Sequence, residues 1–91
     1  MSYDEVNTIL EKIENIARRA IDTLAEALDA LGEIKEAAEE ALELKMPQDV
    51  RTVIESIKAL ACISYSDLND AQMALSAIKT SAQLAVSMLG K

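Results

Sequence analysis

Histidine is absent from this 91-residue chain, so the side chain that most often transfers protons and binds metals near neutral pH is not available. This absence excludes Ser-His-Asp and Cys-His nucleophilic sites, the Glu-x-x-His pairs of di-iron bundles and zinc sites built with histidine. Cys62 is the single cysteine, which excludes thiolate clusters and an internal disulfide. Gly32 and Gly90 are isolated, which excludes a glycine-rich phosphate-binding loop. We therefore predict a protein that is not an enzyme and that uses no cofactor or metal.

The remaining residues with chemical potential each have a structural explanation. Four glutamates recur at helical spacing, but a straight helix sets carboxylates along a line instead of converging them around one Ca²⁺ or Mg²⁺ ion. These are Glu36, Glu39, Glu40 and Glu43. Cys62 lies in an apolar run with no neighbouring base, where a thiol is expected to pack as a small buried or half-buried hydrophobe. Tyr65 is expected to be a packing residue with a polar tip.

Apolar residues of the first half recur in alternating steps of four and three, the heptad pattern of helical bundles and coiled coils. The series is Val6, Leu10, Ile13, Ala17, Ala20, Leu24, Ala27, Leu31, Ile34, Ala38 and Ala41. Gly32 weakens a helix by about 1 kcal/mol relative to alanine. The heptad phase nevertheless passes through Gly32 unchanged, whereas a loop would usually shift it. We predict one helix over about residues 3–45, roughly 60 Å long.

Pro47 lacks the N–H needed inside a helix and predicts a turn at about residues 45–48. A second heptad series then predicts helical structure over about residues 48–90. Its members are Val50, Ile54, Ile57, Ala61, Ser64, Leu68, Ala71, Leu75, Ile78, Ala82, Ala85 and Leu89. Ser64 is the one polar member of this series, and it lies close to Ser66 and Asp67, either of which can cap a new helix. Two interpretations stay open: one kinked helix, or two helices broken near residues 64–67.

The predicted fold is a single all-α domain over residues 1–91, either a long helical hairpin or a three-helix bundle with heptad-type packing. Ordering a residue costs about 1.5 kcal/mol, which apolar burial must offset at about 25 cal/mol per Å². A bare hairpin leaves most of each apolar face in water and cannot reach that balance. We therefore expect a dimer that completes a four-helix-type bundle.

A second apolar row accompanies the heptad series in residues 71–90, where Lys79 is the single charged residue. Surfaces that lack charge and keep methionine and small residues are typical of protein interfaces, because burying an unpaired charge costs several kcal/mol. The predicted interface consists of Met73, Ala77, Leu84, Met88, Leu60 and Ile63. Our leading hypothesis is a non-enzymatic interaction or assembly module, of the scaffold, adaptor or chaperone-like kind. It would bind itself, as a dimer, and another protein.

Acidic residues dominate the first half: residues 1–44 carry twelve Asp and Glu against four Lys and Arg. The predicted acidic face consists of Asp22, Glu26, Asp29, Glu33, Glu36, Glu40 and Glu43. With a net charge of −7 and no basic patch, we expect no direct contact with nucleic acid or with a membrane surface. An alternative hypothesis is a regulatory inhibitor whose acidic helix occupies the basic site of a nucleic-acid-binding protein. The start of the chain is acidic and amphipathic, so we expect neither a leader peptide nor secretion, and we predict a cytoplasmic protein.

Overall fold

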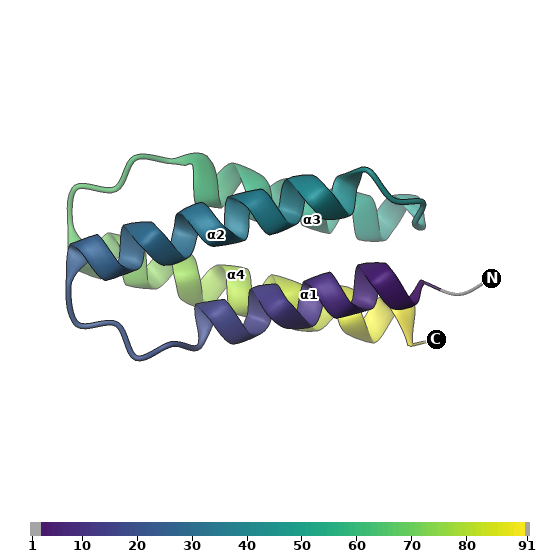
Figure 1. Cartoon of the computed structure of the whole chain (residues 1–91), viewed down its shortest axis with the longest axis horizontal. Coiled ribbons are helices and arrows are strands. Elements are labelled where there is room, and N and C mark those ends of the chain that lie inside the picture. Colours follow the sequence, from purple (N-terminus) through teal and green to yellow (C-terminus); the bar gives the residue numbers. More distant parts are fainter. Residues whose placement is uncertain (1–2, 91) are drawn as a thin grey trace.

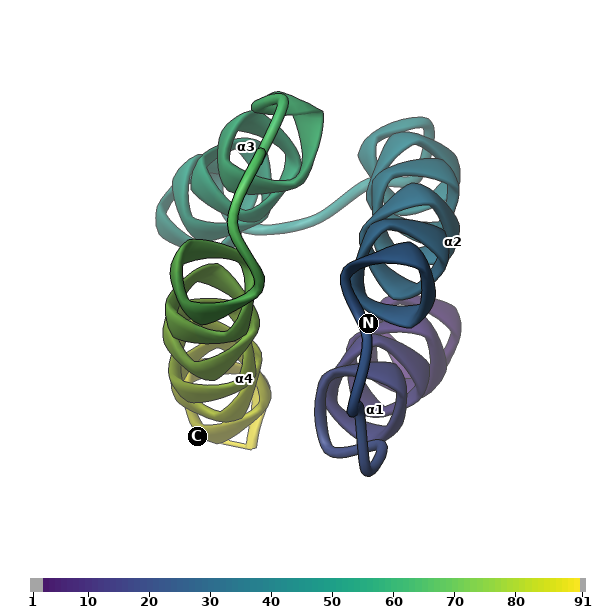
Figure 2. The same ribbon diagram turned by 90° about the vertical axis from the view of Figure 1, so that its left-hand side faces the viewer.

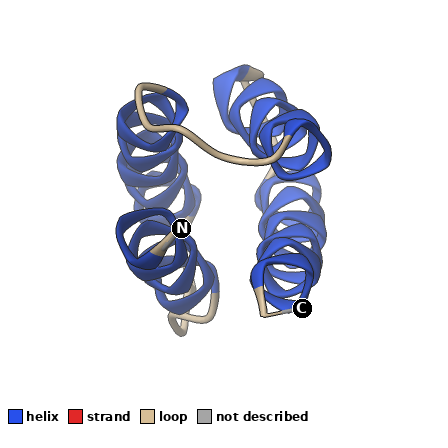
Figure 3. Cartoon of the chain, turned by 90° about the vertical axis from the view of Figure 1, so that its right-hand side faces the viewer, coloured by secondary structure: helices blue, strands red, loops and turns tan. Residues whose placement is uncertain are grey.

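The computed structural model describes residues 3–90, which form four helices and no strand. Residues 1, 2 and 91 lie outside the described part. The helices are α1 (Asp4–Ala17), α2 (Leu24–Leu42), α3 (Gln48–Cys62) and α4 (Leu68–Leu89). Successive helices run in opposite directions along a bundle of 41 × 19 × 16 Å (Figure 1). An end view shows the four helices joined by loops (Figure 3). Each helix packs against its two neighbours around the bundle, and α2 also touches α4 across the diagonal (Figure 2).

The prediction of a single helix over residues 3–45 was wrong, because α1 ends at Ala17 and α2 begins at Leu24. Thr23 starts the new helix from an extended conformation, and its Oγ1 accepts the Glu26 backbone N–H at 3.2 Å. The Thr23 hydroxyl also donates to the Glu26 carboxylate at 3.0 Å. This Thr-x-x-Glu pattern is the signature of a helix start. The loop between the helices happens to preserve the heptad phase, so an unbroken phase did not imply an unbroken helix.

Gly32 does not break α2, as expected from the heptad phase. It lies on the exposed side of the helix, and a Cβ built on it meets nothing within 4 Å. Glycine thus costs this helix some stability without ending it.

The second half is broken where the polar residues cluster, which selects the interpretation with two helices. Residues 63–67 connect α3 to α4. The Tyr65 hydroxyl donates to the Leu60 carbonyl at 2.8 Å and so satisfies a free acceptor at the end of α3. Burial raises the pKa of Tyr65 above its ordinary value, and the Asp70 charge adds to the effect. The predicted turn at Pro47 is present, between the end of α2 and the start of α3.

The core lies inside one chain and contains residues of both heptad series together with Ile9, Ile16, Ala30 and Ala37. Its largest fully buried side chains are Leu10, Ile13, Leu31, Ile34, Ile54, Ile57, Ile78, Val6 and Val50. Alanines of α2 and α4 are buried between them and allow close helix packing. Four helices in one chain correct the expected hairpin or three-helix bundle. The energetic argument for a dimer assumed a bare hairpin, and it no longer applies.

Removing the Thr23 cap of α2 tests whether the first half of the chain is divided into two helices. Thr23→Ala is expected to lower the free energy of unfolding by about 1 kcal/mol, because the Glu26 N–H loses its acceptor. Thr8→Ala is the control, since Thr8 is exposed in the interior of α1 and alanine is the better helix former. Denaturant unfolding followed by circular dichroism measures both. An equal effect of the two substitutions would contradict the cap.

Candidate functional site

The outer face of α4 carries the most exposed large apolar side chains of the described residues. Met73 is 64% exposed and Leu84 is 55% exposed, with the exposed Ala77 between them along the helix. At about 100° per residue these three side chains point within roughly 40° of one another. We call Met73, Ala77 and Leu84 the α4 outer row. The row extends about 16 Å along the helix at roughly 1.5 Å per residue.

The structure separates the other predicted interface residues from this row. Met88 and Leu60 are partly buried and pack against the core, so they contribute only their edges to the surface. Ile63 is 52% exposed and lies just beyond the end of α3, in the loop that leads to α4. Leu28 of α2 is 40% exposed and was not predicted, because it belongs to neither heptad series.

Glutamines on one flank of α4 hold it against α1 and its loop. The Gln72 amide donates to the Ile21 carbonyl at 3.0 Å, and the Gln83 amide donates to the Glu14 carboxylate at 3.0 Å. On the same flank, Ser76 and Lys79 line a shallow depression whose other wall is residues 17–19. These contacts explain the uncharged polar arc of α4 in part. The surface that needs another explanation is the α4 outer row.

The predicted acidic residues are all exposed, as expected of a solvated face. Asp22 lies in the loop before α2, and the others lie on α2 or at its end, which shortens the continuous face from the expected 60 Å rod to about 25 Å. Arg19 binds Glu33 through two contacts, at 2.6 and 3.2 Å. The hydrogen bond from Arg19, together with its charge, lowers the pKa of Glu33, and Glu33 raises the pKa of Arg19. The Lys58 Nζ of α3 lies 3.7 Å from the Glu39 Oε2 of α2, which makes a second ion pair on this helix.

Cys62 is exposed, contrary to the expectation of a buried or half-buried thiol. It is the last residue of α3. At about 100° per residue it points roughly 100° away from the buried stripe of that helix, whose nearest member is Ala61. An apolar neighbourhood in the sequence therefore did not imply a buried position.

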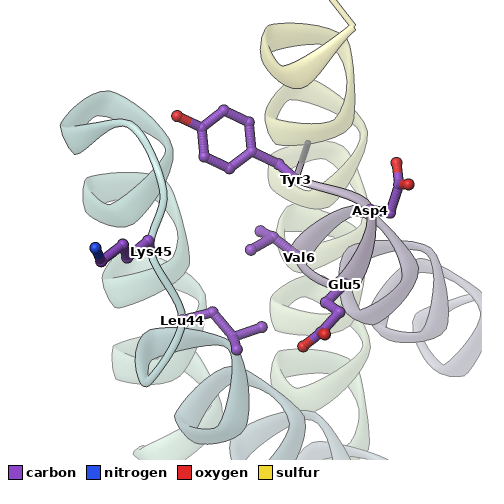
Figure 4. Close-up of a pocket in the computed structure, with 6 residues that line it drawn as sticks. All are labelled: Tyr3, Asp4, Glu5, Val6, Leu44 and Lys45. Atoms are coloured by element: carbon purple, nitrogen blue, oxygen red, sulfur yellow. The ribbon is translucent and has the colours of Figure 1, made fainter. Parts of the chain in front are cut away.

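An open pocket of about 390 Å³ lies at the end of the bundle that holds both chain termini. Tyr3, Val6 and Leu44 form its apolar part, and Val6 and Leu44 point toward one another (Figure 4). The side chains of Asp4 and Lys45 point away from each other, so they do not converge on one ligand (Figure 4). Nowhere in residues 3–90 do three or more Asp, Glu or Cys side chains gather as they would around a metal ion.

None of the four described helices is both long enough and apolar enough to cross a membrane. Comparisons with protein-family models, with curated proteins and with solved structures found no match. The function is therefore inferred from the surface of the described residues.

Proposed function

We propose that the protein is a non-enzymatic helical interaction module, of the scaffold, adaptor or chaperone-like kind, that associates through the α4 outer row. The observation that carries this proposal is the exposure of Met73 and Leu84, 64% and 55%, on a helix with only two charged residues, Asp70 in its first turn and Lys79. Burying these side chains against an apolar partner is favourable at about 25 cal/mol per Å². No charged side chain lies between Met73 and Leu84 on the outer arc, because Lys79 points roughly 120–160° away from the row and Asp70 lies about one turn before Met73, at the end of the row.

The partner in the first place is a second copy of the chain, which would form a dimer. A chain with a net charge of −7 repels its own copies, so two copies approach best where negative charge is lowest. The acidic face lies on α2, and α2 and α4 occupy opposite corners of the bundle (Figure 2). Two α4 helices can therefore meet with the acidic faces on the outside of the pair. A helix of another protein with an apolar face fits the same row.

The size of the row sets the strength of this association. A single pair of helices in contact over about 16 Å buries less than the roughly 800 Å² per partner of a standard stable interface. We expect a transient dimer with a dissociation constant of about 100 µM or weaker, because the interface is small.

Charge substitutions in the row test the proposal. Leu84→Glu and Met73→Glu are each expected to weaken self-association at least about tenfold, because a carboxylate loses water in the dimer. Ser76→Glu is the matched control, since Ser76 lies on the same helix but faces the basic residues Arg18 and Arg19. Sedimentation velocity at about 10 µM to 1 mM gives the dissociation constants, and circular dichroism shows that each variant is folded. A strict monomer over that range, or equal weakening by Ser76→Glu, would overturn the proposal of self-association.

A second candidate function is a regulatory inhibitor that occupies a basic site of a nucleic-acid-binding protein. It is favoured by the exposed carboxylates of α2, since the ion pairs found within residues 3–90 neutralise only Glu33 and Glu39 of that helix. Binding of a polylysine peptide would then weaken steeply between about 50 and 200 mM salt, where the screening length shortens toward roughly 8 Å. Glu36→Gln combined with Glu40→Gln would weaken it further, whereas Leu84→Glu would not. Absence of binding at 50 mM salt would exclude this function.

A further inference from the structure

Two of the three connections keep the helical register of the helices that they join. Ala17 and Leu24 flank the first loop and are one heptad apart. Ala61, the second-last residue of α3, and Leu68, the first residue of α4, have the same spacing across the last loop. In the bundle the chain reverses direction at both loops, so no packing contact there requires this spacing. The heptad positions inside the loops, Ala20 and Ser64, are exposed.

The composition of these loops also permits a helix. Residues 18–23 and 63–67 contain neither glycine nor proline, and the described residues include no positive φ angle. Each loop therefore reaches helical geometry without strain from a special residue. The connection between α2 and α3 differs, because it contains Pro47, the only proline of the chain. It stays a turn in any arrangement of the helices.

Both register-keeping loops lie at one end of the bundle, and the Pro47 turn lies at the other (Figure 1). Among the contacts between neighbouring helices, those of α1 with α4 and of α2 with α3 are the most extensive (Figure 2). The molecule is thus two antiparallel helix pairs joined by two hinges that lie side by side. If both hinges straighten, each pair keeps its own packing and the two pairs separate.

We propose that the chain has a second, open state in which residues 18–23 and 63–67 are helical, and that two open chains exchange halves. The α1–α4 pair of one copy packs against the α2–α3 pair of the other, which gives a dimer of two complete four-helix bundles. The contacts of α1 with α4 and of α2 with α3 stay within each copy, and the contacts between the two pairs are formed again between the copies, so the exchange needs no new surface. The proposal is independent of the α4 outer row, which stays exposed in both states.

Interactions at the two hinges set the balance between the states. The closed chain has the Thr23 cap, the bond from Tyr65 to the Leu60 carbonyl and the ion pair of Arg19 with Glu33. Opening breaks the cap and the tyrosine bond because both belong to helix ends that no longer exist. It separates the ion pair because Arg19 and Glu33 are about 21 Å apart along a straight helix. Opening gains continuous helical hydrogen bonds across both loops. Because the exchange is bimolecular, high concentration during folding favours the open dimer.

A distance within one chain identifies the exchanged dimer. Glu5 and Glu40 line a common pocket in the closed bundle, whereas they are about 50 Å apart along a straight helix. We would attach spin labels to Glu5→Cys and Glu40→Cys in a Cys62→Ser background and dilute them tenfold with unlabelled Cys62→Ser chain. The mixture is unfolded in denaturant, refolded at about 1 mM, and the dimer is isolated by size-exclusion chromatography. Electron spin resonance is expected to show a distance near 50 Å in the dimer and a short one in the monomer.

Proline in the hinges provides the matched control. Asp22→Pro with Ser66→Pro is expected to suppress the long-distance dimer at least about tenfold, because proline interrupts a helix but is compatible with a loop. Neither Asp22 nor Ser66 donates a backbone hydrogen bond within residues 3–90. A dimer that shows only the short distance would overturn the proposal and leave the α4 outer row as the interface. A wild-type chain that remains monomeric after refolding at 1 mM, or equal long-distance fractions with and without the prolines, would also overturn it.

Discussion

Ile78→Ala is expected to lower the free energy of unfolding by about 3 kcal/mol, whereas Leu84→Ala on the same helix is expected to change it by less than about 0.5 kcal/mol. Ile78 is 0% exposed and belongs to the core cluster, while Leu84 is 55% exposed on the α4 outer row. Truncating Ile78 removes apolar atoms from the core and leaves a cavity among closely packed neighbours. Truncating Leu84 removes atoms that already face water.

Both variants are measured by urea unfolding at about 10 µM, where the closed chain is expected to be monomeric. A protein of this size has roughly 5–10 kcal/mol of stability, so Ile78→Ala removes a large share of it. An unchanged dependence of the unfolding free energy on urea shows that the unfolded states are comparable. An Ile78→Ala effect below about 1 kcal/mol would contradict the assignment of the core. An equally large effect of Leu84→Ala would show that the outer row is covered even in dilute solution.

The core was predictable from the sequence because the same stripe of apolar residues is buried whether the helices are long or short. Ile34 and Ile57 hold heptad positions, and both are 0% exposed. The helix number was not predictable from that stripe, because a register-keeping loop leaves no trace in the heptad pattern. The signal that did exist was local: Thr23 and Glu26 form a helix-start signature inside the series. The energetic argument for a dimer assumed a two-helix hairpin, so it does not apply to a chain with four helices.

The exposed apolar residues of the candidate site were predictable from the sequence, whereas the polar contacts beside them were not. The apolar row in the charge-poor residues 71–90 identified Met73 and Leu84, which are exposed. The role of Gln72 was not predictable, because its acceptor is the Ile21 carbonyl, which is free only since the chain leaves the helix after Ala17. Sequence patterns report which face of a helix is apolar. They do not report which polar residues a distant loop will bind.

Proline substitutions at two positions distinguish the observed break from an unbroken first helix. Gly32→Pro is expected to lower the free energy of unfolding by about 3 kcal/mol, because Gly32 lies in the interior of α2. Proline there removes a hydrogen bond to the preceding turn, and its ring collides with the carbonyl of Leu28. Asp22→Pro is expected to change stability by less than about 1 kcal/mol, since Asp22 lies in the loop just before the Thr23 cap.

The comparison is informative because the two positions are equivalent in a helix over residues 3–45, where each would be interior and each proline would cost about the same. Gly32→Ala separates the effect of proline from the loss of glycine, and it is expected to stabilise the chain by about 0.5–1 kcal/mol, since its Cβ meets no neighbour. Thermal and urea unfolding measure all three variants. If Asp22→Pro destabilised the chain as strongly as Gly32→Pro, residues 18–23 would be helical in solution at low concentration. In that case the open state, and not the closed bundle, would be the resting form of the chain.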